Sequence, residues 1–207
     1  SDLMANLMTK LPAKARDRIR KGKSGEIFKQ LVADAMKASV DEKAPLGDRV
    51  SAVRTLGLAE FDKVNPRFAE FLKFRQPEAI QKAALDTLAR FEQTDASGLV
   101  IAAWPSLSPQ VRASAAEMLF SRPTSIGVFL DAVENGTIKT GEIDPARIKL
   151  LQSFADANIR ARADKLFKGT QLSSRKDVVA AYQKALELKG DLKNGKELFK
   201  KNCAACH

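Results

Sequence analysis

Apolar residues recur every three or four positions along almost the whole chain, which is the spacing of an amphipathic helix. In the stretch that follows Pro77, for example, Ile80, Ala84 and Leu88 share one face. A proline is accepted in the first turn of a helix, so Pro77 suits the start of this one. No stretch alternates apolar and polar residues with the two-residue period of a strand. The pattern therefore predicts an all-α fold.

Turn-forming residues divide the pattern into short helices. Ser24 is expected to cap a helix that contains Met36, and Asp48 is expected to open the next one. Asn65-Pro66 is expected to precede a helix, and Asn135-Gly136 is expected to end one. The chain is thus predicted to be a series of helices joined by turns.

Three of the predicted helices repeat one pattern. "DRVSAVRTL" (48–56), "IQKAALDTL" (80–88) and "VRASAAEML" (111–119) each contain an alanine that is followed four residues later by a leucine. The alanines, at positions 52, 84 and 115, are 32 and 31 residues apart, which leaves room for two short helices and two turns in each repeat. Small residues let neighbouring helices approach closely, and the leucines fill the space beside them. This is typical of an α-solenoid of stacked helix pairs.

We therefore expect residues 1–168 to form a HEAT-like α-solenoid, although HEAT units are usually longer, about 40–47 residues. A similar unit, "NIRARADKLF" (158–167), follows an insertion, "ENGTIKTGEIDPARIKLL" (134–151). The alternative is an irregular helical bundle in which the Ala and Leu spacing is coincidental.

Composition and charge add a basic surface to this picture. The chain has 44% hydrophobic residues, enough for a core, and a formal net charge of +10. From Lys10 to Lys23 there are seven positive residues and one Asp, and from Lys168 to His207 nine Lys or Arg and four Asp or Glu. Such a surface suits nucleic acid, anionic lipid or an acidic protein, but without a recognition motif we favour a solvated helix face.

Neither a transmembrane segment nor a leader is expected in this chain. No run approaches the roughly 20 apolar residues that span a bilayer. The first residues, "SDLMANLMTK", lack the basic start, apolar stretch and small-residue cleavage site of a signal peptide. The chain is therefore expected to be either cytosolic or a piece of a longer precursor.

The repeats contain no recognisable catalytic constellation. There are no paired carboxylates, no glycine-rich phosphate loop and no histidine that could act as a base. Trp104, which precedes a proline, is expected to be a packing residue. We predict no catalytic residue, and whether the protein is part of an enzyme stays open.

A last pair of helices is predicted after the repeats. The first spans 175–190, with Ser173 or Ser174 as its cap and Gly190 as its end. Its apolar residues form one stripe, so we expect it to pack on something: Val178, Tyr182, Ala185 and Leu186. Asp191 is expected to cap the second helix.

The last five residues, "CAACH", hold both cysteines and the only histidine of the chain. C-x-x-C-H is the attachment motif of c-type haem. Cys203 and Cys206 have the spacing that reaches the two vinyl groups of a porphyrin, and His207 is then placed as the proximal ligand of the iron. The motif therefore predicts covalently bound haem c.

The motif fits three rival chemistries less well. A zinc site needs a second pair of Cys or His ligands, which this chain lacks. A thioredoxin-like C-x-x-C needs a βαβ context, and no strands are predicted. A plain disulfide between Cys203 and Cys206 gives His207 no role.

The stretch "SSRKDVVAAYQKALELKGDLKNGKELFKKNCAACH" (173–207) resembles a junction in large haem-binding proteins of planctomycetes. These are the PVC-type haem-binding C-x-x-C-H proteins, also described as membrane-bound dehydrogenases. In that family a β-propeller dehydrogenase-like domain is followed by HEAT-like repeats and a C-terminal cytochrome c domain. The likeness covers Ala96 to His207, and its specific part is Val178 to His207.

The resemblance implies a division of the chain and a role for its end. Residues 169–190 would be a connecting helix, and 191–207 the N-terminal fragment of a truncated cytochrome c domain with its first helix. Cys203 and Cys206 would bind haem c, and His207 would be the proximal iron ligand. Since the propeller, the cytochrome body and a distal ligand are missing, we expect the chain to be a fragment of a longer protein.

Two functions follow as hypotheses. The first is an electron-transfer module of a larger periplasmic oxidoreductase, whose helical repeats position the haem and whose partner is a redox protein or an upstream dehydrogenase domain. Lys196, Lys200 and Lys201 would steer an acidic redox partner. The alternative is a protein-binding helical-repeat scaffold with no redox role of its own. Nucleic-acid binding through Lys10 to Lys23 is the least favoured hypothesis.

Overall fold

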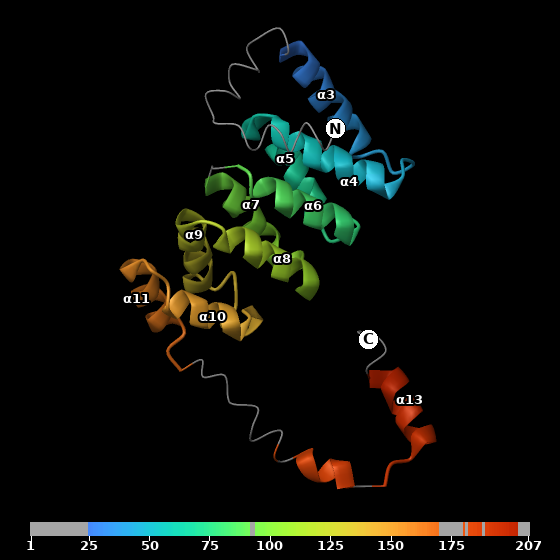
Figure 1. Ribbon diagram of the computed structural model, residues 1–207, viewed down its shortest axis with the longest axis vertical. Coiled ribbons are helices and arrows are strands. Elements are labelled where there is room, and N and C mark those ends of the chain that lie inside the picture. The colour runs from blue at the N-terminus through green and yellow to red at the C-terminus, as the bar shows by residue number, and fades with distance from the viewer. Residues whose placement is uncertain (1–24, 92–93, 170–179, 181, 188, 203–207) are drawn as a thin grey trace. The chain divides into compact units, whose positions relative to one another are not determined.

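The computed structural model describes residues 25–91, 94–169, 180, 182–187 and 189–202 (Figure 1). Every regular element within these ranges is an α-helix or a short 3-10 helix, and no strand occurs among them. The prediction of an all-α fold is therefore confirmed. The chain divides into two units, Ser1–Leu166 and Phe167–His207, and each is described by itself.

The first unit holds most of the described helices. They follow one another through short turns, and their bounds are α3 Gly25–Ala38, α4 Leu46–Thr55, η1 Leu56–Leu58, α5 Phe61–Phe71, α6 Glu78–Leu88, α7 Thr94–Ala103, η2 Trp104–Ser106, α8 Pro109–Phe120, α9 Pro123–Glu134, η3 Thr140–Glu142, α10 Pro145–Gln152 and α11 Ala157–Leu166.

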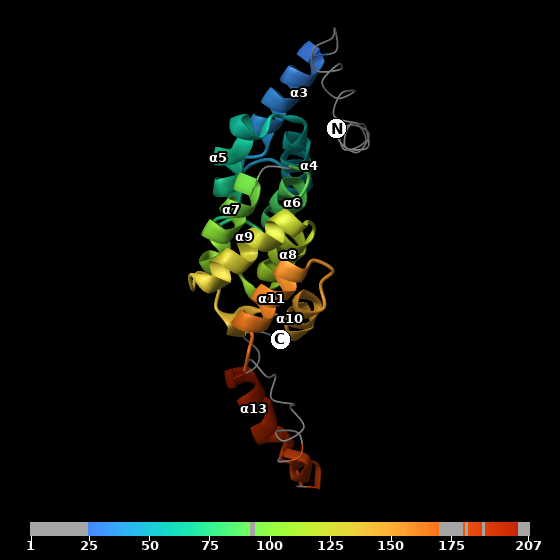
Figure 2. The same ribbon diagram turned by 90° about the vertical axis from the view of Figure 1, so that its left-hand side faces the viewer.

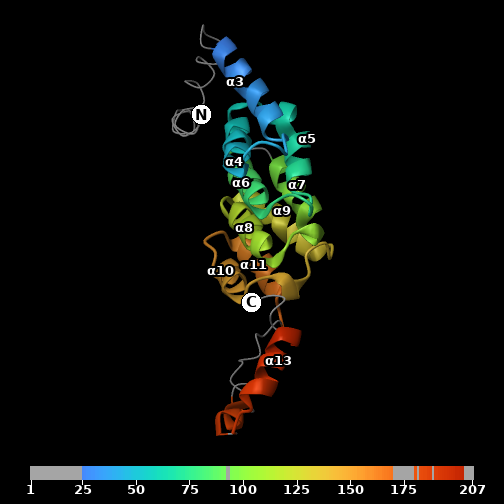
Figure 3. The ribbon, with the colours of Figure 1, turned by 90° about the vertical axis from the view of Figure 1, so that its right-hand side faces the viewer.

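These helices lie in two rows (Figures 2 and 3). In one row α4, α6 and α8 pack in succession, and in the other α5, α7, α9 and α11 do so. The helix α3 packs against α4 and η1 at one end of the rows. At the other end α10 packs against α11, and Arg147 of α10 pairs with Glu117 of α8. Neighbours in a row are therefore helices that are close in the sequence.

The repeated alanines and leucines are the buried contacts of the first row. Ala52, Ala84 and Ala115 lie in α4, α6 and α8, and all three are buried. The leucines that follow them by four residues are also buried: Leu56, Leu88 and Leu119. Small side chains at matching buried positions let neighbouring helices approach closely, so we interpret the alanines as contacts between the helices of this row.

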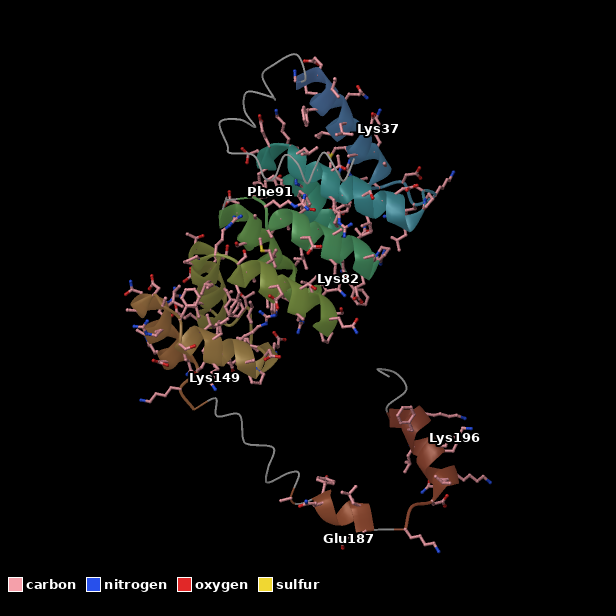
Figure 4. The ribbon with its side chains drawn as sticks, in the orientation of Figure 1. Lys37, Lys82, Phe91, Lys149, Glu187 and Lys196 are labelled. Carbon is pink, nitrogen blue, oxygen red and sulfur yellow. The ribbon has the colours of Figure 1, made fainter. Side chains whose placement is uncertain are left out.

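Aromatic side chains fill the space between the two rows. Phe91 follows α6, and its ring centroid lies 5.3 Å from that of Phe61 and 5.8 Å from that of Phe68, both in α5 (Figure 4). Farther along, Phe129 of α9 lies 6.2 Å from Trp104 and 5.1 Å from Phe120, again between ring centroids. These tilted pairs add to the free energy gained by burying the rings.

Two helix starts differ from the sequence prediction. Pro66 lies inside α5 instead of preceding a helix. A proline in that position removes one backbone hydrogen bond, but Phe61, Val64 and Phe68 are buried on the same face and keep the helix continuous. Helix α4 begins at Leu46 and not at Asp48. The residue before it, Pro45, occupies the N-cap position, so the helix begins directly after the proline.

The predicted insertion contains a helix. Asp144 caps α10, since its carboxylate accepts a hydrogen bond from the backbone N–H of Ala146 at 2.7 Å, and Pro145 occupies the first turn. Because α10 intervenes, the segment 158–167 lies in α11, which packs on α9 and α10. It is therefore not a fourth member of the row formed by α4, α6 and α8.

The described part of the second unit contains η4 Lys184–Glu187 and α13 Leu192–Asn202. Tyr182, Ala185 and Leu186 were expected to lie on a packed stripe, but all three are exposed, Tyr182 at 72% and Leu186 at 87%. The expectation was wrong for these three residues, because nothing in the described part of the second unit covers this turn. Val178 and the proposed caps Ser24, Ser173 and Ser174 lie outside the described residues.

Candidate functional site

The helix α13 ends at Asn202, directly before the C-x-x-C-H motif. Asp191 caps its first turn, as predicted from the sequence. One carboxylate oxygen of Asp191 accepts hydrogen bonds from the backbone N–H groups of Lys193 at 2.9 Å and Asn194 at 3.0 Å. A capping carboxylate satisfies two of the four free N–H groups and is favoured by the helix dipole. The start of α13 is therefore fixed by a local interaction.

The two faces of α13 differ in chemistry. Its large apolar residues gather on one side and are exposed: Leu192 at 93%, Leu198 at 51% and Phe199 at 52%. The opposite side carries four lysines, Lys193, Lys196, Lys200 and Lys201. Lys196 extends away from the helix (Figure 4), and Lys200 pairs with Glu197 at 3.3 Å. An amphipathic helix ordinarily buries its apolar face, so the exposure of Leu192 and Phe199 leaves room for a further apolar group beside them.

The predicted haem residues Cys203, Cys206 and His207 lie outside the described residues. What the structure describes is the segment that leads to them. It is compatible with a covalently attached porphyrin because apolar side chains are exposed in the described turns of α13 that lead to the first thiol. Two thiols and an imidazole are also the donor set that haem c requires.

The described residues contain neither a cluster of metal ligands nor a membrane span. Across the ranges that the structure describes, no three His, Cys, Asp or Glu side chains gather where they could hold a metal ion. None of the helices described is both long and apolar enough to cross a bilayer.

A cavity of about 470 Å³ with a mainly apolar lining lies in the first unit among η2, α8, α9, η3 and the start of α10. Trp104 is buried beside it, and its indole Nε1 donates to a carboxylate oxygen of Glu142 at 3.1 Å. The guanidinium of Arg112 donates to the other carboxylate oxygen of Glu142 at 3.0 Å and to the carbonyls of Trp104 and Pro105 at 3.1 Å each.

The electrostatics of this cavity keep Glu142 ionised. Burial raises the pKa of its carboxyl, but the hydrogen bonds from Trp104 and the backbone of Lys139, together with the charge of Arg112, outweigh burial and hold the pKa below its ordinary value. Trp104, Arg112 and Glu142 line the cavity and are already hydrogen-bonded to one another. We interpret the cluster as a structural link between η2, α8 and η3.

A similar link joins α9 and α11. Arg162 donates to Asp131 at 2.6 Å and to Glu134 at 3.0 Å. Burial lowers the pKa of the Arg162 guanidinium, and the bonds to the two carboxylates outweigh burial and raise it.

Sequence reasoning missed both links, although it correctly assigned Trp104 to packing. The partners are 28 to 38 positions apart in the chain. No local pattern marks such pairs, because one partner always lies on a helix of the next repeat.

Comparison of the chain with protein-family models, with curated proteins and with solved structures finds no match. Its function is therefore argued from its own residues.

Proposed function

We propose that this chain is an electron-transfer module in which helical repeats carry a covalently bound c-type haem at the C-x-x-C-H motif. One observation carries the proposal: the segment that leads into the motif is a capped, amphipathic helix whose apolar side chains are exposed. A short helix with an exposed apolar face gains its stability from something that covers that face. A porphyrin attached at the next residue is an apolar group of the kind that would lie beside it.

Each residue of the motif has a separate task in this proposal. Cys203 and Cys206 would hold the porphyrin through thioether bonds, and His207 would bind the iron. The haem supplies one-electron transfer when it is bound. The carboxylate of Asp191 fixes the start of α13, and the helix would in turn position the first thiol.

The basic side of α13 suits an acidic redox partner. Lys193, Lys196, Lys200 and Lys201 are exposed within nine residues of one another, and only Glu197 opposes them. Such a cluster accelerates encounter with an acidic surface, and the effect falls as ionic strength rises.

For the first unit we propose an α-solenoid of HEAT-like helix pairs. The two rows of successive helices support this arrangement, as do the buried alanines in α4, α6 and α8. The role of the solenoid would be that of a scaffold for the haem-bearing segment. Because haem c is attached outside the cytoplasm, a periplasmic location is part of the proposal, as is membership of the PVC-type haem-binding family.

The test is covalent haem on residues 1–207. The chain would be exported behind a bacterial signal peptide in cells that also express the c-type maturation system, and a known c-type cytochrome would serve as the control for maturation. We expect haem staining that survives SDS denaturation and a pyridine haemochrome spectrum corresponding to about one haem per chain. The variant Cys203→Ser/Cys206→Ser should carry none.

A wild-type chain without covalent haem, in cells where the control cytochrome is matured, would overturn the proposal. The second candidate function would then stand in its place: a scaffold that binds protein segments without redox chemistry. The observation that favours it is the packing of successive helices in two rows, an extended arrangement whose surface commonly binds protein segments.

A further inference from the structure

A groove at the α3 end of the first unit has a volume of about 430 Å³. Phe28, Val32 and Met36 of α3 line one side of it. Leu58 and Val64, from η1 and α5, line the other side. Its size is that of pockets that take small ligands or a few side chains of a protein segment.

The chemistry of the groove calls for an apolar occupant. Phe28 and Val32 pack against the buried Leu58 but remain partly exposed. The charged groups on the rim are already paired along their own helices, Lys29 with Glu26 at 2.6 Å and Lys63 with Glu60 at 2.8 Å. No charge on the rim therefore requires an ion or a polar ligand.

The position of α3 gives a second reason to expect an occupant. It packs against α4 and η1 and is the first described helix of the rows. On the same helix Ile27 is 68% exposed. The ends of stacked helical arrays ordinarily need a capping element, because the outer face of the last unit is otherwise apolar and exposed.

The chain itself contains a matching segment. Gly25 lines the groove, and 24 residues precede it. Five of the first eleven are large apolar residues at a spacing that would put them on one face of a helix: Leu3, Met4, Leu7, Met8 and Leu11. Between Leu3 and Leu11 the only charged residue is Lys10.

We propose that residues 3–11 dock in this groove through Leu3, Met4, Leu7, Met8 and Leu11 and cap the α3 end of the helical rows. Each of residues 12–24 can span at most about 3.3–3.6 Å. The connection is therefore long enough for residues 3–11 to reach the groove from Gly25. Residues 12–24 are also rich in Lys and Arg, which suits a connection that is exposed to water. This inference is independent of the haem proposal.

An occupant from the same chain is favoured over a second copy of the protein. A stable dimer ordinarily buries about 800 Å² on each partner. A tethered segment has an effective concentration in the millimolar range, so a small apolar groove is sufficient to hold it.

The test uses the full chain and two matched double substitutions. Leu7→Asp/Met8→Asp places two charges on the apolar face of the segment. Asn6→Asp/Thr9→Asp adds the same charge on the opposite face. The readouts are hydrogen exchange of the backbone amides of residues 28–36, fluorescence of an added apolar dye, and mass by light scattering. None of the four positions belongs to a described helix, so no core contact of the rows is removed.

If residues 3–11 dock in the groove of their own chain, light scattering should give the mass of a monomer for the wild type. In the Leu7→Asp/Met8→Asp chain, α3 should exchange at least tenfold faster and dye fluorescence should rise several-fold. A synthetic peptide of residues 1–11 added to that chain should reverse both changes, and Asn6→Asp/Thr9→Asp should behave as wild type.

Three results would overturn the inference. The first is unchanged exchange of α3 in the Leu7→Asp/Met8→Asp chain. The second is an equal change in both double variants, which would make the effect one of charge alone. The third is a wild-type dimer that dissociates on substitution of Leu7 and Met8, which would assign the groove to a second copy.

Discussion

Glu142 accepts hydrogen bonds from three groups, the indole of Trp104, the guanidinium of Arg112 and the backbone N–H of Lys139. Its side chain joins η3 to η2 and α8, which lie more than twenty residues earlier in the chain. A carboxylate bonded in this way contributes to stability only while it is ionised.

The substitution Glu142→Gln should therefore have a pH-dependent cost. The pKa of Glu142 is lower in the folded chain than its ordinary value of 4.5, so its stabilisation is fully present above that value and is lost as the pH falls through the folded-state pKa. We expect Glu142→Gln to lower the free energy of unfolding by about 1 kcal/mol at neutral pH and by much less near pH 3. Urea denaturation at both pH values measures this.

The exposed Glu42 provides the control, because Glu42→Gln makes the same change in charge without removing a buried contact. It should change the free energy of unfolding by no more than about 0.5 kcal/mol. A cost for Glu142→Gln that is equal at both pH values would show that the carboxylate charge plays no part in the link.

At the scale of a helix, Ala84 has the contact that defines the first row. It is fully buried in α6, which packs on α4 and on α8. A larger side chain there has to push a neighbouring helix away. We expect Ala84→Leu to lower the free energy of unfolding by about 1–3 kcal/mol.

The control lies on the same helix. Ala79 is exposed, and Ala79→Leu makes the same substitution more than one turn earlier. Leucine and alanine both favour helix, so this change should be nearly neutral. Equal midpoints of urea denaturation for the two variants would contradict the role assigned to the buried alanine.

The sequence allowed most helices to be predicted, because their apolar faces recur at a clear period and their ends carry proline, glycine or a capping residue. Ala52, Ala84 and Ala115 were predicted as contacts and are buried. The missed helix, α10, has only eight residues and buries only Ile148 and Leu151, so its pattern was too short to recognise. Pro66 was misplaced because the contacts that keep α5 continuous come from other helices.

The site could be predicted less fully than the fold. The spacing of Cys203, Cys206 and His207 is a local signal and indicates haem chemistry, and the cap at Asp191 is also local. The link at Glu142 is not local, since it depends on how η3 turns back towards α8. The groove beside α3 could not be predicted either, because it exists only where two helices meet.

At the scale of the first unit, contacts connect each helix mainly to the next members of the two rows. In such an array stability is close to a sum of terms for each helix pair and each interface between pairs. A helix at the end has a neighbour on one side only, so it can open without disturbing the rest. A bundle around one shared core would instead open as a whole.

Hydrogen exchange of the native protein distinguishes these two arrangements. If the first unit is a solenoid, the slowest amides of α6 and α8 should exchange more slowly than those of α3 and α11, with intermediate rates between them. Ala84→Leu weakens the interfaces of α6, so it should accelerate exchange in α4 and α6 much more than in α11, which lies several helices away. A single common rate for the slowest amides of all these helices, raised equally by Ala84→Leu, would contradict the solenoid. It would favour a bundle, because only a shared core transmits one substitution to every helix alike.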